Sequence, residues 1–180
     1  WHDVPKTRVI ELALEEDQVI GLGPLVQKFG TNYRLITAGC KLVWRYCLAV
    51  ETALQLAPHF KFDKSDDGGV LAGYLKAWRS SGNSVSARMR RLMQTVVADP
   101  QEPEQLIGDL AEKLGLLPLE RALDECLQKM DFRAVILIDR LDEGYEPTDA
   151  GVGFVDGIVS ATVAFNAKHQ PVRTLLFLRD

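Results

Sequence analysis

The sequence predicts an α/β fold built around a parallel β-sheet. Residues 133–138 and 172–178 are apolar runs with the length of strands, and the first has the composition of a strand buried on both faces. Residues 148–168, which lie between these runs, have the length and apolar content of a helix. A strand, a helix and a strand in this order form a right-handed crossover between parallel strands.

A further strand is expected near the amino end, over residues 7–14, where apolar and polar side chains partly alternate. Residues 16–29 are expected to form two short helical turns, because glycines and a proline interrupt their apolar spacing. From Tyr33 to Ala57 apolar residues recur at helical spacing, which predicts a long helix that Pro58 ends.

The middle of the chain, residues 33–130, is expected to be a mainly helical insertion between strands of the sheet. Lys61 to Gly69 is polar and rich in glycine, so we expect a loop there. A linker is expected over residues 99–103. The shorter helices are expected around residues 70–78, after Ser84, over 104–114, and over 118–130, where Pro118 would begin the last of them.

The bulk composition excludes some classes of protein. A chain of 180 residues is long enough for one domain with a sizeable core. The net charge of −4 argues against a protein that binds nucleic acid over its whole surface. No apolar run of about 18 residues stands out, so no membrane span is expected. We expect a cytoplasmic protein.

The cysteines and histidines point to no metal or redox centre. The cysteines are too few for a disulfide framework, and none belongs to a Cys-x-x-Cys motif. We expect thiols in the apolar core, with a metal or redox role as the alternative, at Cys40, Cys47 and Cys126. The scattered histidines are expected at the surface: His2, His59 and His169.

The carboxylates that follow the strand at 133–138 are the leading candidates for chemistry. Asp139 ends this strand, and ligands bind at the carboxyl ends of strands in open α/β sheets. Its carboxylate could bind Mg²⁺, or it could be an ordinary helix-capping or loop aspartate. Glu143 is a candidate base that orients water, with a solvated loop acid as the alternative. The role of Asp142 stays open, because it could hold the loop or meet a neighbouring subunit.

Arg179 ends the last apolar strand and should emerge beside Asp139 if the two strands pair. There it could contact a γ-phosphate, or it could form a simple salt bridge with a carboxylate.

A basic segment from Ser84 to Arg91 could contact the phosphates of a nucleic acid or a nucleotide. The alternative is the solvated face of a helix. The aromatic residues of the helical part are expected in its core: Trp44, Tyr46, Phe60 and Trp78.

Two segments, Leu137 to Pro147 and Leu175 to Asp180, resemble bacterial P-loop ATPases related to the STAND and KAP groups. The Walker B motif of those proteins is an apolar run followed by Asp, any residue, an apolar residue, and Asp-Glu or Asp-Arg. The resemblance also takes in the helix from Tyr33 to Ala57 and extends over roughly half of the chain. One part of the pattern is missing, because no G-x-x-x-x-G-K-[ST] phosphate loop occurs in the sequence.

The resemblance implies a partial P-loop NTPase core, with ATP and Mg²⁺ as cofactors. It assigns the Mg²⁺-binding acid to Asp139 and the acid that assists hydrolysis to Glu143, or alternatively to Asp142. It assigns the sensor residue at the end of the next strand to Arg179. We also expect a longer protein, with a strand and the missing phosphate loop before Trp1.

The expected function is that of an ATP-hydrolysing switch domain in a larger bacterial protein, serving in defence or signalling. Its partners would be ATP and its own further domains or another protein, and homo-oligomers would fit the same resemblance. Two alternatives stay open. One is a non-catalytic interaction domain that keeps a degenerate NTPase fold, and the other is a module associated with nucleic acid.

Overall fold

The structure, a computed structural model of the chain, describes residues 6–13, 22–59, 66–80, 84–96, 101–130, 132–140 and 147–177. Its elements follow one another in the order β1 (Lys6–Ala13), α2 (Gly23–Val26), η1 (Gln27–Phe29), α3 (Tyr33–Leu56), η2 (Ala57–His59), α4 (Asp66–Arg79), α5 (Val85–Val96), α6 (Pro103–Lys113), α7 (Leu116–Lys129), β2 (Phe132–Asp139), α8 (Asp149–Lys168) and β3 (Val172–Leu176).

The strands form a three-stranded sheet in the order β1-β2-β3, and both pairs are parallel. In the register of this sheet, Val9 lies beside Val135, and Val135 lies beside Arg173. Helix α8 is the crossover from β2 to β3. The predicted α/β class and the parallel pairing of the last two strands are therefore confirmed.

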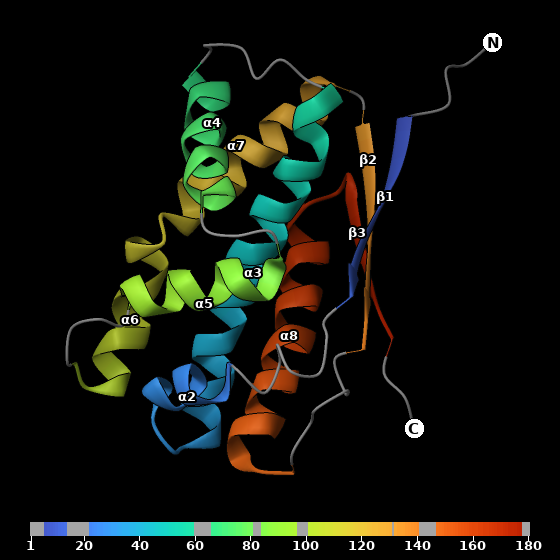
Figure 1. Cartoon of the computed structure of the whole chain (residues 1–180). Helices are drawn as coiled ribbons and strands as arrows, with labels where there is room; N and C mark the ends of the chain where they lie inside the picture. Colours follow the sequence, from blue (N-terminus) through green and yellow to red (C-terminus); the bar gives the residue numbers. More distant parts are fainter. Residues whose placement is uncertain are drawn as a thin grey trace.

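All the labelled helices lie on one side of the sheet, as Figure 1 shows. The side chains that β2 turns toward them are the buried ones, and every second residue of this strand faces the helices, as expected for a strand. Those residues are Phe132, Ala134, Ile136 and Ile138. The long helices α3 and α8 pack against each other and form the layer next to the sheet. The hydrophobic core fills the space between this layer and β2 and continues among α3, α4, α5, α6 and α7.

Two glycines of α8 let it approach α3 closely. A Cβ atom built at Gly157 would lie 2.4 Å from Cβ of Cys40, and one at Gly153 would lie 2.6 Å from Cγ2 of Ile36. Both separations are far shorter than van der Waals contact. The absence of a side chain at these positions therefore sets the distance between the two helices.

The outer edge of β3 is held by α8. The Asn166 side chain accepts a hydrogen bond from Thr174 N–H at 2.7 Å and donates one to Thr174 O at 3.0 Å. Phe177 N–H donates to Ile138 O on the opposite side of the strand. One amide side chain thus replaces the backbone of a neighbouring strand at this point.

Most of the expected helices are present with shifted ends. The helix predicted from Tyr33 is α3, and the Asn32 side chain caps it by accepting from Arg34 N–H at 2.9 Å. The loop expected up to Gly69 is wrong over its last residues, because α4 already begins at Asp66. Pro118 lies in the first turn of α7 and does not begin it, which is allowed because N–H groups there have no helical partner.

The predictions for the cysteines and histidines have different outcomes. Cys40 and Cys47 are buried in the core, as expected. Cys126 is half-buried and packs against the core. His169 is completely buried, so its expected place at the surface is wrong.

The expected core positions of Trp44, Tyr46 and Trp78 are confirmed. Phe60 lies outside the described residues.

Among the described residues, helix α8 is long and apolar enough to cross a membrane by length and composition alone, a test that core helices of globular proteins also pass. The expectation of no membrane span stays a prediction. In the structure α8 packs against α3 and β3 as the crossover of the sheet.

Candidate functional site

Asp139 is the last residue of β2, the central strand of the sheet. It lies beside Ala13, the last residue of β1, so the carboxyl ends of the two strands meet at one edge. Its side chain is exposed, and its Oδ1 atom accepts a hydrogen bond from Arg140 N–H at 2.9 Å. Arg140 has a φ angle of 62°, which turns the chain away directly after the strand.

The carboxylate of Asp139 has the right chemistry for a hard cation such as Mg²⁺. This ion prefers oxygen ligands, keeps several of its waters, and often takes only one or two carboxylates from the protein. Within the described ranges no group of three or more His, Cys, Asp or Glu side chains is placed to hold a metal. A single carboxylate at the sheet edge is compatible with Mg²⁺ that is held mainly by phosphate and water.

The other predicted site residues, Asp142, Glu143 and Arg179, lie outside the described residues. The carboxyl ends of β2 and β3, which precede these residues in the chain, do lie together. Phe177, two residues before Arg179, hydrogen-bonds to Ile138, which directly precedes Asp139. The predicted neighbourhood of the two strand ends is therefore present. The positions of the side chains stay predictions.

A buried ionic cluster, which the sequence did not predict, lies between α3, α7 and α8. Glu120 of α7 is fully buried and accepts two hydrogen bonds from Arg45, from Nε at 3.0 Å and from Nη2 at 2.7 Å. Lys168 Nζ lies 2.6 Å from its Oε2 atom. Glu120 belongs to the apolar stripe that includes Leu116 and Leu123. An acid within such a stripe was the signal available in the sequence.

His169 extends this cluster at the end of α8. Its Nδ1 atom lies 3.5 Å from Asp124 Oδ1, and its ring lies 4.4 Å from that of Phe165. Burial lowers the pKa of His169, while the carboxylates of Glu120 and Asp124 act in the opposite direction. The lowered pKa means that the neutral imidazole is the form the fold favours.

A second buried ion pair corrects the interpretation of the basic segment. Arg88 is buried, pairs with Glu51, and places its guanidinium 5.5 Å from the centre of the Trp78 ring. Trp78 Nε1 also donates to Glu51 Oε1 at 2.7 Å. Arg88 is therefore part of the core, and its guanidinium is engaged there.

The arginines that follow in this segment face outward. Arg90 and Arg91 are exposed, and Arg91 donates a hydrogen bond to the carbonyl of Ser80 at 3.0 Å. The exposed basic surface is thus smaller than the sequence indicated.

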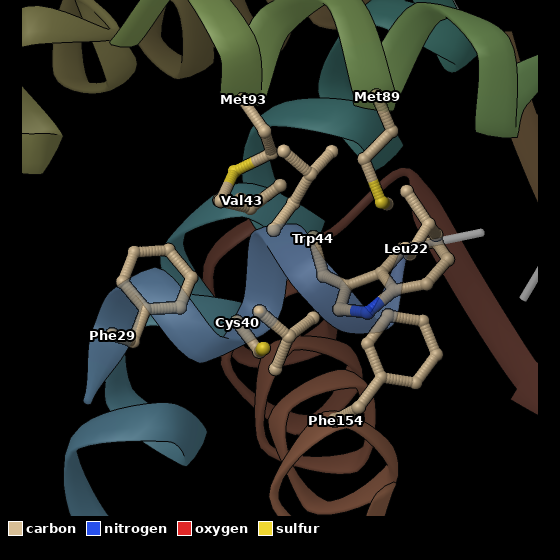
Figure 2. Close-up of a pocket in the computed structure, with 10 residues that line it drawn as sticks. Leu22, Phe29, Cys40, Val43, Trp44, Met89, Met93 and Phe154 are labelled. Carbon is tan, nitrogen blue, oxygen red and sulfur yellow. The ribbon is translucent and has the colours of Figure 1, made fainter. Parts of the chain in front are cut away.

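Figure 2 shows an apolar pocket between α2, α3, α5 and α8, with Trp44, Met89, Met93 and Phe154 around it. The rings of Trp44 and Phe154 lie 5.5 Å apart. The thiol that lines the pocket is that of Cys40, and burial raises the pKa of this thiol to about 12. The thiolate is therefore scarce at neutral pH, and the pocket offers packing instead of acid–base or nucleophilic chemistry.

Comparison with known proteins gives one informative match. No protein-family model matches the chain, and no solved structure matches it. Over 181 residues, the chain is similar to a transposon gamma-delta 80.3 kDa protein of Escherichia coli (strain K12), with 31% identity. The similarity covers 100% of this chain but only 26% of that relative, so the chain spans about a quarter of the relative's length.

Proposed function

We propose that this chain is part of an ATP-dependent switch domain in a larger, cytoplasmic bacterial protein. In this proposal Asp139 supplies the carboxylate that helps to hold Mg²⁺ on the phosphates. The observation that carries it is the place of Asp139, exposed at the carboxyl end of the central strand of a parallel sheet. Ligands of open parallel sheets bind at this edge.

The strand arrangement supports the same proposal. The strand that ends in Asp139 pairs in parallel with the strand that leads to Arg179, which the resemblance to P-loop ATPases requires. Bound Mg²⁺ would neutralise charge on the phosphates. Of the chain's own residues, Asp139 would bind the cation, Glu143 or Asp142 would orient water, and Arg179 would contact a phosphate. The loop that cradles the phosphates would have to come from outside this chain, since no G-x-x-x-x-G-K-[ST] motif occurs in it.

The relative in Escherichia coli is compatible with a switch domain inside a longer polypeptide, since the chain spans 26% of it. The substrates and partners of the whole protein belong to the proposal. Homo-oligomers and roles in defence or signalling stay predictions from the resemblance.

The test is Mg²⁺-dependent ATP binding by the full-length protein that contains this chain, with Asp139→Asn as the variant. We expect the affinity for Mg-ATP to fall at least tenfold, which corresponds to about 1.4 kcal/mol. Asp109→Asn on α6, away from the sheet, is the matched control and should bind as the unmodified protein does. Equal affinity in both variants would refute the role of Asp139.

A second variant separates binding from turnover. Glu143→Gln should keep ATP bound and lose hydrolysis, since the amide cannot act as a base. If the unmodified protein binds no nucleotide at all, the alternative of a non-catalytic interaction domain replaces the proposal.

The structure weakens the nucleic-acid alternative, because Arg88 is buried in an ion pair. It now depends on the exposed Arg90 and Arg91. Salt-sensitive DNA or RNA binding that is lost when these two residues are neutralised would favour it.

A further inference from the structure

On the face of the sheet that points away from the helices, no described helix covers a group of apolar side chains. Val9 is 59% exposed, and Leu175 and Phe177 are each 50% exposed. Val135 and Leu137 of the central strand lie between them and are half-buried. Parallel sheets almost always carry helices on both faces, so a face that no described helix covers is exceptional.

The register arranges these five residues, which we name the open-face stripe, as a diagonal across the sheet. Val9 and Val135 are neighbours, Leu137 and Leu175 are neighbours two residues further along the strands, and Phe177 follows two residues after Leu175. Two strand spacings of about 4.8 Å and four residue steps of about 3.3 Å give a length of about 16 Å. Three turns of an α-helix, roughly 11 residues, have this length.

Charged residues of opposite sign flank the stripe. Arg133 and Arg173 are exposed on the same face of the sheet, along the side of the stripe toward the amino ends of β2 and β3. Glu11 is exposed on the other side, beside Leu137, and Asp139 is exposed on the same face two residues after Leu137. An apolar stripe with cations on one flank and anions on the other complements an amphipathic helix with acids along one edge and basic residues along the other.

The direction of the crossovers between the strands allows a further helix on this face. Both crossovers of the described chain run in the direction from β1 to β3, and both place their helices on the same face. A crossover of the same hand that runs in the opposite direction places its helix on the other face. The relative of which this chain spans 26% has ample sequence to supply one.

We propose that the open-face stripe is the docking site of an amphipathic helix from another part of the same polypeptide, with acidic residues facing Arg133 and Arg173 and a basic residue facing Glu11. A second copy of the chain fits less well, because sheet-on-sheet packing belongs to antiparallel sandwiches while parallel sheets are covered by helices. The inference does not depend on nucleotide binding, so it can stand or fall separately from the function proposed above.

The test is thiol labelling of the full-length protein under native conditions. Single cysteines are introduced as Val9→Cys and Leu175→Cys in the open-face stripe, in a Cys126→Ser background. Leu117→Cys and Val163→Cys are the controls, because these residues of α7 and α8 are 60% and 66% exposed. We expect a maleimide to react at least tenfold more slowly at the stripe than at the controls. Equal rates would overturn the proposal.

Dilution and crosslinking identify what covers the stripe. Protection should be unchanged when the protein is diluted a hundredfold, since the helix belongs to the same chain. A photo-crosslinker attached at the Leu175→Cys site should join to a peptide outside these 180 residues. Protection that disappears on dilution, or crosslinks to a second copy, would assign the face to a dimer and overturn the proposal.

Reversing the charge of the arginines beside the open-face stripe gives a further test. Arg133→Glu combined with Arg173→Glu should speed labelling at the Val9→Cys site severalfold, because the acidic edge of the helix would then be repelled. Arg121→Glu, an exposed residue of α7, is the matched control and should change nothing. Labelling that responds equally to both changes would contradict the proposed complementarity.

Discussion

Glu120 illustrates how single residues hold this fold together. Its carboxylate is fully buried, yet it faces the guanidinium of Arg45 and the ammonium group of Lys168. A buried charge is costly to leave unpaired, and here two cations from other helices compensate for it. The side chain of Lys168 is 40% exposed, so the cluster reaches solvent on one side. This one residue therefore fixes α7 against both long helices.

We predict that Glu120→Gln lowers the free energy of unfolding by about 3 kcal/mol, at the lower end for a broken buried ion pair because Lys168 can turn to water. Urea unfolding followed by circular dichroism measures the change. Glu112→Gln, the same substitution at an exposed position of α6, should shift the midpoint very little. A similar midpoint shift in both variants would show that the cluster contributes no stability.

At the scale of the element, the contact between α3 and α8 is the one that positions the sheet. These helices form the layer under β2, and their separation depends on Gly153 and Gly157. The crossover helix is in turn joined to β3 through Asn166. The carboxyl edge of the sheet, with Asp139, is thus held by helix packing that lies away from the edge itself.

Gly157→Ala should destabilise the protein by about 1–3 kcal/mol, because the new methyl group would overlap Cβ of Cys40 and force the helices apart. Gly108→Ala is the control, since nothing lies within 4 Å of a Cβ at that position of α6. That change should stabilise the protein by up to about 1 kcal/mol through helix propensity. Opposite signs of the two midpoint shifts in urea would support the close crossing, and equal signs would contradict it.

At the scale of the whole molecule, His169 connects the stability of the fold to pH. It lies where α7, α8 and the start of β3 meet, and burial lowers its pKa. The unfolded chain, with an ordinary histidine pKa near 6.5, therefore binds a proton more readily than the folded protein does. Between the lowered pKa and about 6.5, the contribution of His169 to stability therefore rises with pH and falls as the solution becomes more acidic.

We predict that the free energy of unfolding drops between pH 7.5 and pH 5.5, and that His169→Gln makes this drop smaller. The comparison uses the slope against pH, because the substitution also changes packing against Phe165. Urea midpoints at several pH values measure it. An unchanged slope in the variant would show that other groups cause the pH dependence.

Local spacing along the chain was sufficient to predict several parts of the molecule. The apolar period of residues 33–57 was sufficient for α3, and the strand–helix–strand order predicted the parallel pair of β2 and β3. It also placed Asp139 at the end of a strand, because an apolar run followed by an acid is a local pattern. These features need no knowledge of distant contacts.

The burial of charged residues, and the face of the sheet that no described helix covers, depend on how the elements pack in three dimensions. Arg88 and Glu120 resemble ordinary helix residues, and their burial depends on partners 37 and 75 positions away along the chain, Glu51 and Arg45. The open-face stripe arises in the same way, since it is formed by the register of three strands and by the side on which the helices pack. Local spacing fixes the elements, whereas the environment of a side chain is fixed by residues that the fold brings to it.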